Sequence, residues 1–291
     1  MLSAVSSPSS STLTAMQSLR SLNKQTTALQ SQIATGKRVN SAKDDAAIWS
    51  LSMDLKSNIA TNTETLKGLS AGEAMLKTAS SAMDSIRQIL KDMDSAITKA
   101  QLNGQTENQL EVILNDYIAS LETVADNAEY QGTNLVKGLA SVTKTIVTSV
   151  KKDGSVNSFS VAGQVVNTGA ATGTWKDLKD AVTALSGTTA LTRSDTNVAD
   201  LVTKLTAAVT ASDTAAAAFN GKLSVISVQS EFLTKMNDNM SQSLSAMVDT
   251  DMDEASARLT ALQTQQQLAT QLLSITAQNQ ASLLQTLFRS F

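Results

Sequence analysis

The sequence predicts a mainly α-helical protein: a long coiled-coil helical rod with its N- and C-terminal helices paired, plus a β-hairpin and a small variable insertion. Residues that interrupt helices are rare outside the middle of the chain, because Pro8 is the only proline and seven of the 12 glycines lie between residues 132 and 187. Apolar residues on both sides of this middle recur at alternating steps of three and four, the spacing of coiled-coil packing. Only 3% of residues are aromatic, which suits closely packed helices better than a thick globular core.

The N-terminal segment carries the first helical repeat. Its apolar face steps by four and three through Ala15, Leu19, Leu22, Thr26, Leu29 and Ile33. Gly36 is expected to end this helix, because glycine readily takes the left-handed conformation found just past a helix C-terminus. Asn40 and Ser41 then offer caps for the next helix, and the carboxylates of Asp44 and Asp45 favour its N-terminal dipole.

Three further segments repeat the same spacing, the last with two polar interruptions. They are Leu76, Ala79, Met83, Ile86, Leu90, Met93, Ile97 and Ala100; Leu110, Leu114, Tyr117, Leu121, Val124 and Ala128; and Ile226, Ser230, Leu233, Asn237, Met240, Leu244 and Met247. Residues 222–291 contain neither glycine nor proline. Such a stretch would extend about 100 Å as one helix at ~1.5 Å per residue, which favours a rod. An ordinary bundle of helices is the alternative that the pattern leaves open.

The middle of the chain lacks the repeat of three and four residues and has a different pattern. Polar and apolar residues alternate on both sides of Asp153-Gly154, which predicts a β-hairpin at about residues 142–163, because glycine tolerates the positive φ of a tight turn. A helical stretch at 175–185, a loop rich in Thr, Ser and Asp, and an Ala-rich helical stretch at 198–219 follow. The composition is typical of a surface, so we expect an insertion between two helical arms.

The absence of two residue types excludes much chemistry. The chain has no histidine and no cysteine, which excludes Ser-His-Asp and Cys-His catalysis, HExxH zinc sites, thiolate metal sites and disulfides. We therefore expect no enzyme activity, cofactor or metal. A net charge of −3 without a basic tract argues against nucleic acid. No apolar stretch is long enough for membrane insertion, and the N-terminus lacks the pattern of a cleaved secretory signal.

Two short segments resemble ligand-binding motifs but lack residues that those motifs require. Gly36-Lys37 lacks the upstream glycine of a phosphate loop, and Arg38 stands where Ser or Thr would bind magnesium. The run from Asp249 to Asp253 resembles the start of a calcium loop, but the sixth position is Glu254 instead of glycine. The run is better explained by a helix break that Asp251 or Asp253 recaps.

The two ends of the chain are apolar and almost uncharged. Arg289 is the only ionisable side chain in residues 259–291, so this helix has no charged face for solvent and both of its faces are expected to be buried. A membrane-surface helix is the competing interpretation, but it needs a row of basic residues, and residues 236–291 hold only Arg258 and Arg289. We predict a self-assembly interface formed by Leu19, Leu22, Leu29, Ile33, Leu268, Leu272, Ile275, Leu283 and Leu287.

Several motifs resemble bacterial flagellin. The stretch from Leu29 through Gly36 to Ala47 is similar to that family's N-terminal signature, and Ala125–Leu135, with Gly132 and Asn134, is similar to its turn before the hairpin. The acidic run with Asp251 and Asp253, followed by QQQLA at 265–269 and AQNQ at 277–280, resembles its C-terminal elements. The resemblance covers roughly residues 1–140 and 222–291, and the middle carries no signature.

The resemblance implies a filament subunit of the bacterial flagellum. Residues 1–42 and 252–291 would form an inner coiled-coil layer, residues 43–175 and 215–251 a helical rod domain with the hairpin, and residues 176–214 a small outward-facing segment. It also implies export through the flagellar type III apparatus to an extracellular filament. The implied partners are further copies of the chain, other flagellins, a hook-junction protein, a filament cap and an export chaperone.

Two other functions remain open from the sequence. A hook–filament junction protein shares such terminal helices, but it assembles only a few copies and would be favoured by a large outer domain. A secreted adhesin or binding protein would contact its ligand through residues 140–220, where Trp175 is the only tryptophan.

Overall fold

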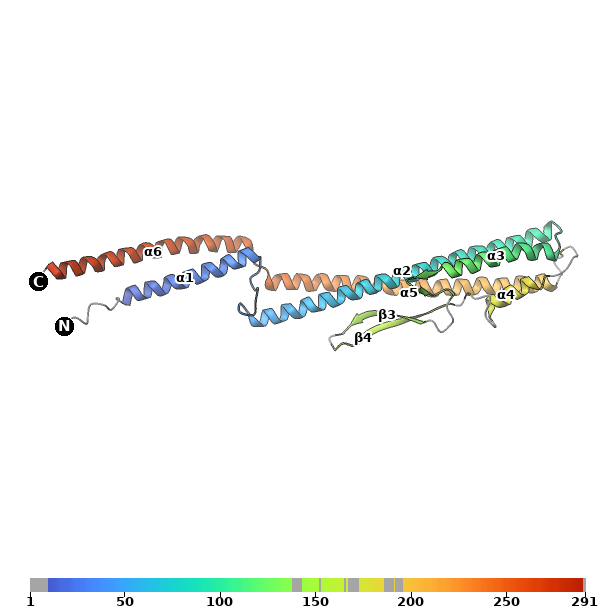
Figure 1. Cartoon of the computed structure of the whole chain (residues 1–291), viewed down its shortest axis with the longest axis horizontal. Coiled ribbons are helices and arrows are strands. Elements are labelled where there is room, and N and C mark those ends of the chain that lie inside the picture. Colours follow the sequence, from blue (N-terminus) through green and yellow to red (C-terminus); the bar gives the residue numbers. More distant parts are fainter. Residues whose placement is uncertain are drawn as a thin grey trace. The chain divides into compact units, whose positions relative to one another are not determined.

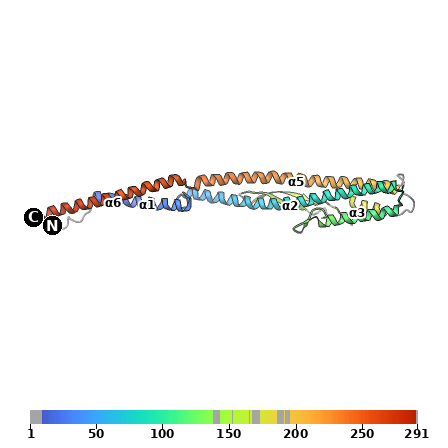
Figure 2. The same ribbon diagram turned by 90° about the horizontal axis from the view of Figure 1, so that it is seen from above.

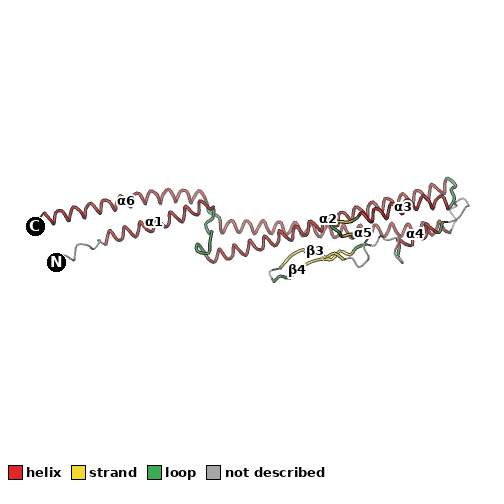
Figure 3. The backbone as a smooth tube through the Cα atoms, in the orientation of Figure 1, coloured by secondary structure: helices red, strands yellow, loops and turns green. Residues whose placement is uncertain are grey.

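The computed structural model describes residues 10–137, 143–151, 153–164, 166, 173–185, 191 and 196–289. Helices dominate this part of the chain, which confirms the mainly α prediction (Figure 1). The helices are α1 (Ser10–Thr35), α2 (Ala46–Leu102), α3 (Glu107–Asn127), α4 (Thr174–Thr183), α5 (Thr196–Val248) and α6 (Met252–Arg289). The strands are β1 (Glu129–Tyr130), β2 (Thr133–Asn134), β3 (Thr143–Val150) and β4 (Val156–Ala162), which form two antiparallel pairs (Figure 3).

The chain divides into two compact units. The first comprises Met1–Ile59 with Asp238–Phe291, and the second comprises Ala60–Asn237. The long helices α2 and α5 contribute to both units. The first unit therefore contains both ends of the chain, and the second contains the hairpin.

In the first unit the N- and C-terminal helices pair, as the repeat predicts. Helices α1 and α6 lie side by side in both views (Figures 1 and 2), and Gln266 Nε2 of α6 donates a hydrogen bond to Asn23 Oδ1 of α1. Thr26, in the middle of the α1 repeat, is only 7% exposed. The half-buried positions of α6 also step by three and four, through Leu259, Leu262, Gln266, Ala269 and Leu273.

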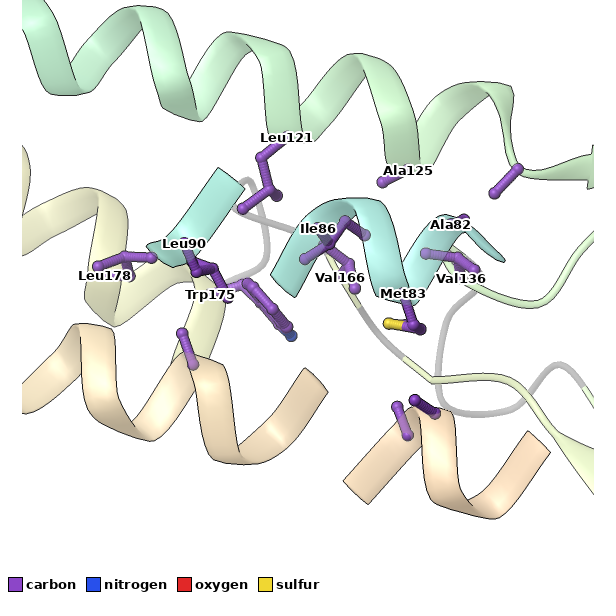
Figure 4. Close-up of a cluster of buried hydrophobic side chains, with 14 of the residues drawn as sticks. Ala82, Met83, Ile86, Leu90, Leu121, Ala125, Val136, Val166, Trp175 and Leu178 are labelled. Carbon is purple, nitrogen blue, oxygen red and sulfur yellow. The ribbon is translucent and has the colours of Figure 1, made fainter. Parts of the chain in front are cut away.

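The second unit contains a continuous hydrophobic core, which α2, α3, α4 and α5 build (Figure 4). The predicted repeat of α2 lies in this core, because each of its eight residues from Leu76 to Ala100 is at most 2% exposed. Hydrogen bonds set α2 against α5: Asn62 Nδ2 donates to Asn237 Oδ1 (3.0 Å) and Ser80 Oγ donates to Asn220 Oδ1 (3.0 Å). Since the numbers rise on one helix as they fall on the other, α2 and α5 run antiparallel.

The predicted hairpin is confirmed as β3 and β4. Ile146 pairs with Phe159, and a bulge between Val147 and Ser149 interrupts the register. Gly154 in the turn has a φ of +81°, which is the conformation expected of the Asp-Gly sequence. The hairpin rests on α2 where that helix has no side chain, because a Cβ added at Gly72 would lie 2.8 Å from Ile146 Cδ1.

The variable middle contributes more to the core than its composition suggests. In residues 176–214, Leu178 and Val182 of α4 and Leu201 and Leu205 of α5 are at most 2% exposed. Helix α5 begins at Thr196 and passes Gly221 without a break, so the Ala-rich stretch and the following helix form one element. Its buried small residues, Ala208, Ser212, Ala215 and Ala216, suit a narrow interface between helices, whereas its threonines are exposed. Hydropathy alone does not distinguish such an interface from a surface.

Candidate assembly interface

The two interruptions of the long helices meet at one joint in the first unit. Gly36, just past α1, has a φ of +69° and ends that helix as predicted. Arg38 N donates to Val248 O (2.7 Å) and Thr250 N donates to Gly36 O (3.0 Å), so the segment after α1 is bound to the segment between α5 and α6. Val39 and Val248 are both 2% exposed and shield these hydrogen bonds from water.

The residue that caps α2 differs from the expectation. Asn40 and Ser41 do not cap the helix: Asp45, immediately before it, accepts hydrogen bonds through Oδ1 from the backbone N–H groups of Ala47 (3.0 Å) and Ile48 (2.9 Å). Asn40 and Ser41 lie too early in the chain, and their own N–H groups donate to Asp44 Oδ2 at 3.0 and 2.9 Å. Sequence order alone does not show which of several cap-forming residues directly precedes the first helical turn.

The break before α6 follows the sequence prediction. Asp251 Oδ1 accepts hydrogen bonds from the backbone N–H groups of Asp253 and Glu254, both at 3.1 Å, so Asp251 caps the helix. Asp253 and Glu254 lie in the first turn, where negative charge favours the helix dipole. The acidic run is thus accounted for by local helix chemistry. Within the residues that the structure describes, no three His, Cys, Asp or Glu residues are grouped so that they could hold a metal ion.

Acid is expected to loosen the turn around Asp44. Hydrogen bonds from the Asn40 N–H, the Ser41 hydroxyl and the Ser41 N–H lower the pKa of this carboxyl below its ordinary value of 3.8. A group whose pKa is lower in the folded state stabilises the turn above its unfolded pKa, and this contribution is lost as the pH falls through the folded pKa. Exchange of the Asn40 and Ser41 amide protons should therefore speed up below about pH 3.8 beyond the intrinsic pH effect. Asp44→Asn should remove this acid-dependent component, and an unchanged profile would contradict the assignment.

Gly132 and Asn134 hold the turn that follows α3. Gln131 (φ +48°) and Gly132 (φ +77°) form the two central positions between β1 and β2, where glycine avoids the strain of a positive φ. The Asn134 side chain donates to Ala125 O (2.7 Å) and accepts from the N–H groups of Val136 (2.8 Å) and Lys137 (2.7 Å). Both residues thus act inside the subunit, fixing how the chain leaves α3.

The predicted interface residues fall into two groups. Leu19, Leu22, Leu29 and Ile33 are half-buried on the face of α1 that repeats against α6. Leu268, Leu272 and Ile275 of α6 are instead 59%, 61% and 55% exposed, at steps of four and three. The backbone of α6 includes Leu283 and Leu287, but their side chains lie outside the described part of the structure. We refer to Leu268, Leu272 and Ile275 as the α6 stripe.

The α6 stripe is a second apolar face on a helix that already uses one. Full burial of a Leu or Ile side chain stabilises by roughly 1.5–3 kcal/mol. Burial of the three exposed side chains together would therefore contribute substantially to the free energy of association. None of the described helices carries an apolar stretch long enough to cross a membrane.

Helix α5 carries a further exposed apolar face, which was not predicted from the sequence. Val225, Val228 and Phe232 of α5 are 49%, 65% and 58% exposed. These three residues are also spaced by three and four, on a face next to that of the buried residues Ile226 and Leu233. This second apolar repeat is the sequence signal from which the exposed face could have been predicted. We refer to Val225, Val228 and Phe232 as the α5 ridge.

Models of one known protein family match both the N-terminal and the C-terminal part of the chain. The family model of the bacterial flagellin N-terminal helical region matches residues 7–141, and that of the C-terminal helical region matches residues 202–287. A flagellin of Brucella melitensis biotype 1 is 31% identical, with 96% of this chain and 97% of the relative aligned. Flagellin C of Rhizobium meliloti is 29% identical over 90% and 92%, and flagellin FljM of Caulobacter vibrioides is 28% identical over 96% and 97%. The chain therefore belongs to the bacterial flagellin family, whose members are structural subunits of the flagellar filament.

Proposed function

We propose that the α6 stripe is the principal surface through which this subunit polymerises. The supporting observation is that one face of α6 packs on α1 while Leu268, Leu272 and Ile275 remain more than half exposed. Copies that bury these side chains against one another lower the apolar area in contact with water. When one surface binds a different surface on the next copy, the contact does not close, and a helical filament grows.

The proposed layers follow the helix pairs. Residues 1–42 and 252–291 form an inner coiled-coil layer, and residues 43–175 and 215–251 form the surrounding helical domain. Residues 176–214 form the outward-facing side of that domain, with Leu178, Val182, Leu201 and Leu205 buried in its core. The pairing of α1 with α6 supports the first assignment. The subunit acts mechanically in this scheme and carries no catalytic site.

Export and assembly are separable if the chain ends gain order only in the filament. We propose that the chain is exported unfolded by the flagellar type III apparatus, with a chaperone covering its apolar ends, and is added beneath a filament cap onto a hook-junction protein. The absence of cysteine supports this route, because no disulfide has to be opened before the chain is threaded. Ordering on assembly would lower the net gain from burial, which allows the soluble subunit to persist.

Seeded polymerisation of the purified chain tests the function. Negative-stain microscopy should show long filaments; short capped assemblies would favour a junction protein, and persistent monomers would favour a binding protein. The Leu268→Ser/Leu272→Ser/Ile275→Ser variant should raise the critical concentration at least tenfold, which corresponds to about 1.4 kcal/mol. Val112→Ser is the control, because Val112 is 65% exposed on α3. Equal critical concentrations for the triple variant and the control would contradict the assignment of the α6 stripe.

A further inference from the structure

An open groove lies between α2 and the hairpin in the second unit. Its volume is about 680 Å³, within the range of roughly 300–1,000 Å³ typical of clefts that bury a ligand. Most of its lining is small or apolar and comes from α2, β1 and β3, and it includes Gly68, Ala71, Met75, Tyr130, Ile146 and Val147. At Gly68 the groove is bordered by backbone without a side chain, and a Cβ added there would meet no atom within 4 Å, so this position has open space around it.

The α5 ridge is an exposed apolar row on the same chain. Phe232 is 58% exposed although the chain has only five phenylalanines, and Val228 beside it is 65% exposed. Aromatic side chains are enriched at the centres of protein interfaces, where they fill pockets of the partner. The ridge thus offers exposed apolar side chains, and the groove of the same chain offers a largely apolar hollow that could receive them.

The groove and the ridge lie at one level but on different sides of the hairpin. The hydrogen bonds Asn62–Asn237 and Ser80–Asn220 place residues 62–80 of α2 opposite residues 220–237 of α5. These ranges contain six of the eight α2 residues that line the groove, and the whole ridge. The hairpin contacts α2 at Gly72 and α5 at Gln229, whose Nε2 donates to Thr148 O (3.1 Å). By these contacts the groove is on the α2 side of the hairpin and the ridge on the α5 side.

The charges beside the two features are compatible with contact. Glu64 and Lys144 line the groove, and Glu64 pairs with Lys67 outside the lining (2.8 Å). On α5, Glu231 and Lys235 pair beside Phe232 (2.6 Å). The side chains of both ion pairs are at least 66% exposed. Each surface therefore presents one glutamate and at least one lysine, so a second copy can bring opposite charges together at the contact.

We infer that the groove of one subunit receives the α5 ridge of a second copy of this chain, as a lateral contact between neighbouring subunits. The inference rests on the filament function. Because groove and ridge are different surfaces on different sides of the unit, the contact is heterologous and leaves one groove and one ridge open for further copies. A filament requires this property, and a closed dimer does not have it.

Cysteine cross-linking tests the contact without a background, because the native chain has no cysteine. Gly68→Cys chains and Phe232→Cys chains are mixed, polymerised and treated with a short bismaleimide. The mixture should give covalent dimers only after polymerisation, and a chain with both substitutions should give a ladder of higher multimers. Gly221→Cys mixed with Phe232→Cys is the matched control, since Gly221 is also a helical glycine with open space around it, and it should give none.

Filaments without Gly68–Phe232 cross-links, or equal cross-linking of soluble monomers, would overturn the proposal. A second pair of variants avoids dependence on Phe232→Cys polymerising. Gly68→Trp fills the groove and should slow filament growth at least tenfold with unchanged helical circular dichroism, whereas Gly68→Ala should grow as the wild type does. Equal growth of these two variants would also overturn the proposal. Failure of the wild-type chain to polymerise would refute the filament function instead.

Discussion

Deletion of residues 259–291 is expected to leave a folded, soluble subunit that no longer forms filaments. The hydrophobic core runs from Leu69 to Leu233 and includes none of the described side chains of the deleted stretch, so the second unit is expected to keep its packing. The same deletion removes the α6 stripe and the partner of α1. Circular dichroism should show a cooperative thermal transition for the core, and seeded samples should remain monomeric by size-exclusion chromatography and microscopy.

The full-length chain under identical seeding is the control for this truncation. Filaments from the truncated chain would show that cohesion lies elsewhere in the subunit. Loss of the cooperative transition would show that the second unit depends on the C-terminal helix, against the separation of cores described above.

Leu90→Ala should lower the free energy of unfolding of the second unit by about 2–5 kcal/mol. Leu90 is fully buried between α2, α3 and α4 (Figure 4), and truncation leaves a cavity that the surrounding helices only partly fill. Leu102→Ala is a matched control, because it makes the same chemical change at the end of the same helix where the side chain is 80% exposed. The control should change stability by no more than about 0.5 kcal/mol.

Urea unfolding, monitored by tryptophan fluorescence, measures the stability of the second unit separately from that of the first unit. Trp175 is 7% exposed in the core of the second unit, and Trp49 lies in the first unit, so a Trp49→Phe background leaves one reporter. A similar midpoint for Leu90→Ala and Leu102→Ala would contradict the packing of this region.

Periodicity and turn residues were sufficient to predict the helices and the hairpin. Both depend on local sequence, such as the run from Leu76 to Ala100 or the turn Asp153-Gly154. The pairing of the chain ends was predictable for another reason, because both ends have apolar faces and little charge. The end of α1 at Gly36 and the cap at Asp251 could be predicted for the same reason, because helix termini have their own local chemistry.

Features that depend on distant residues could not be predicted in this way. Gly72 costs the interior of α2 some stability as a helix residue, and its use becomes evident only when Ile146, far along the chain, packs against it. The sequence also does not show which of the predicted interface residues pack within the chain. Leu22 and Leu272 both belong to apolar repeats, but Leu22 is half-buried on the face of α1 toward α6, whereas Leu272 is exposed. The groove likewise arises from α2, β1 and β3 together, and no single segment encodes it.

The joint between the two helix breaks has a consequence for how the subunit carries force. Both covalent connections, after α1 and before α6, are tied to each other by backbone hydrogen bonds between residues more than 200 positions apart, including Arg38 with Val248. Tension or torque applied to either terminal helix is thereby divided between two strands of peptide. A torsionally driven propeller built from such subunits does not rely on one unsupported linker in each copy.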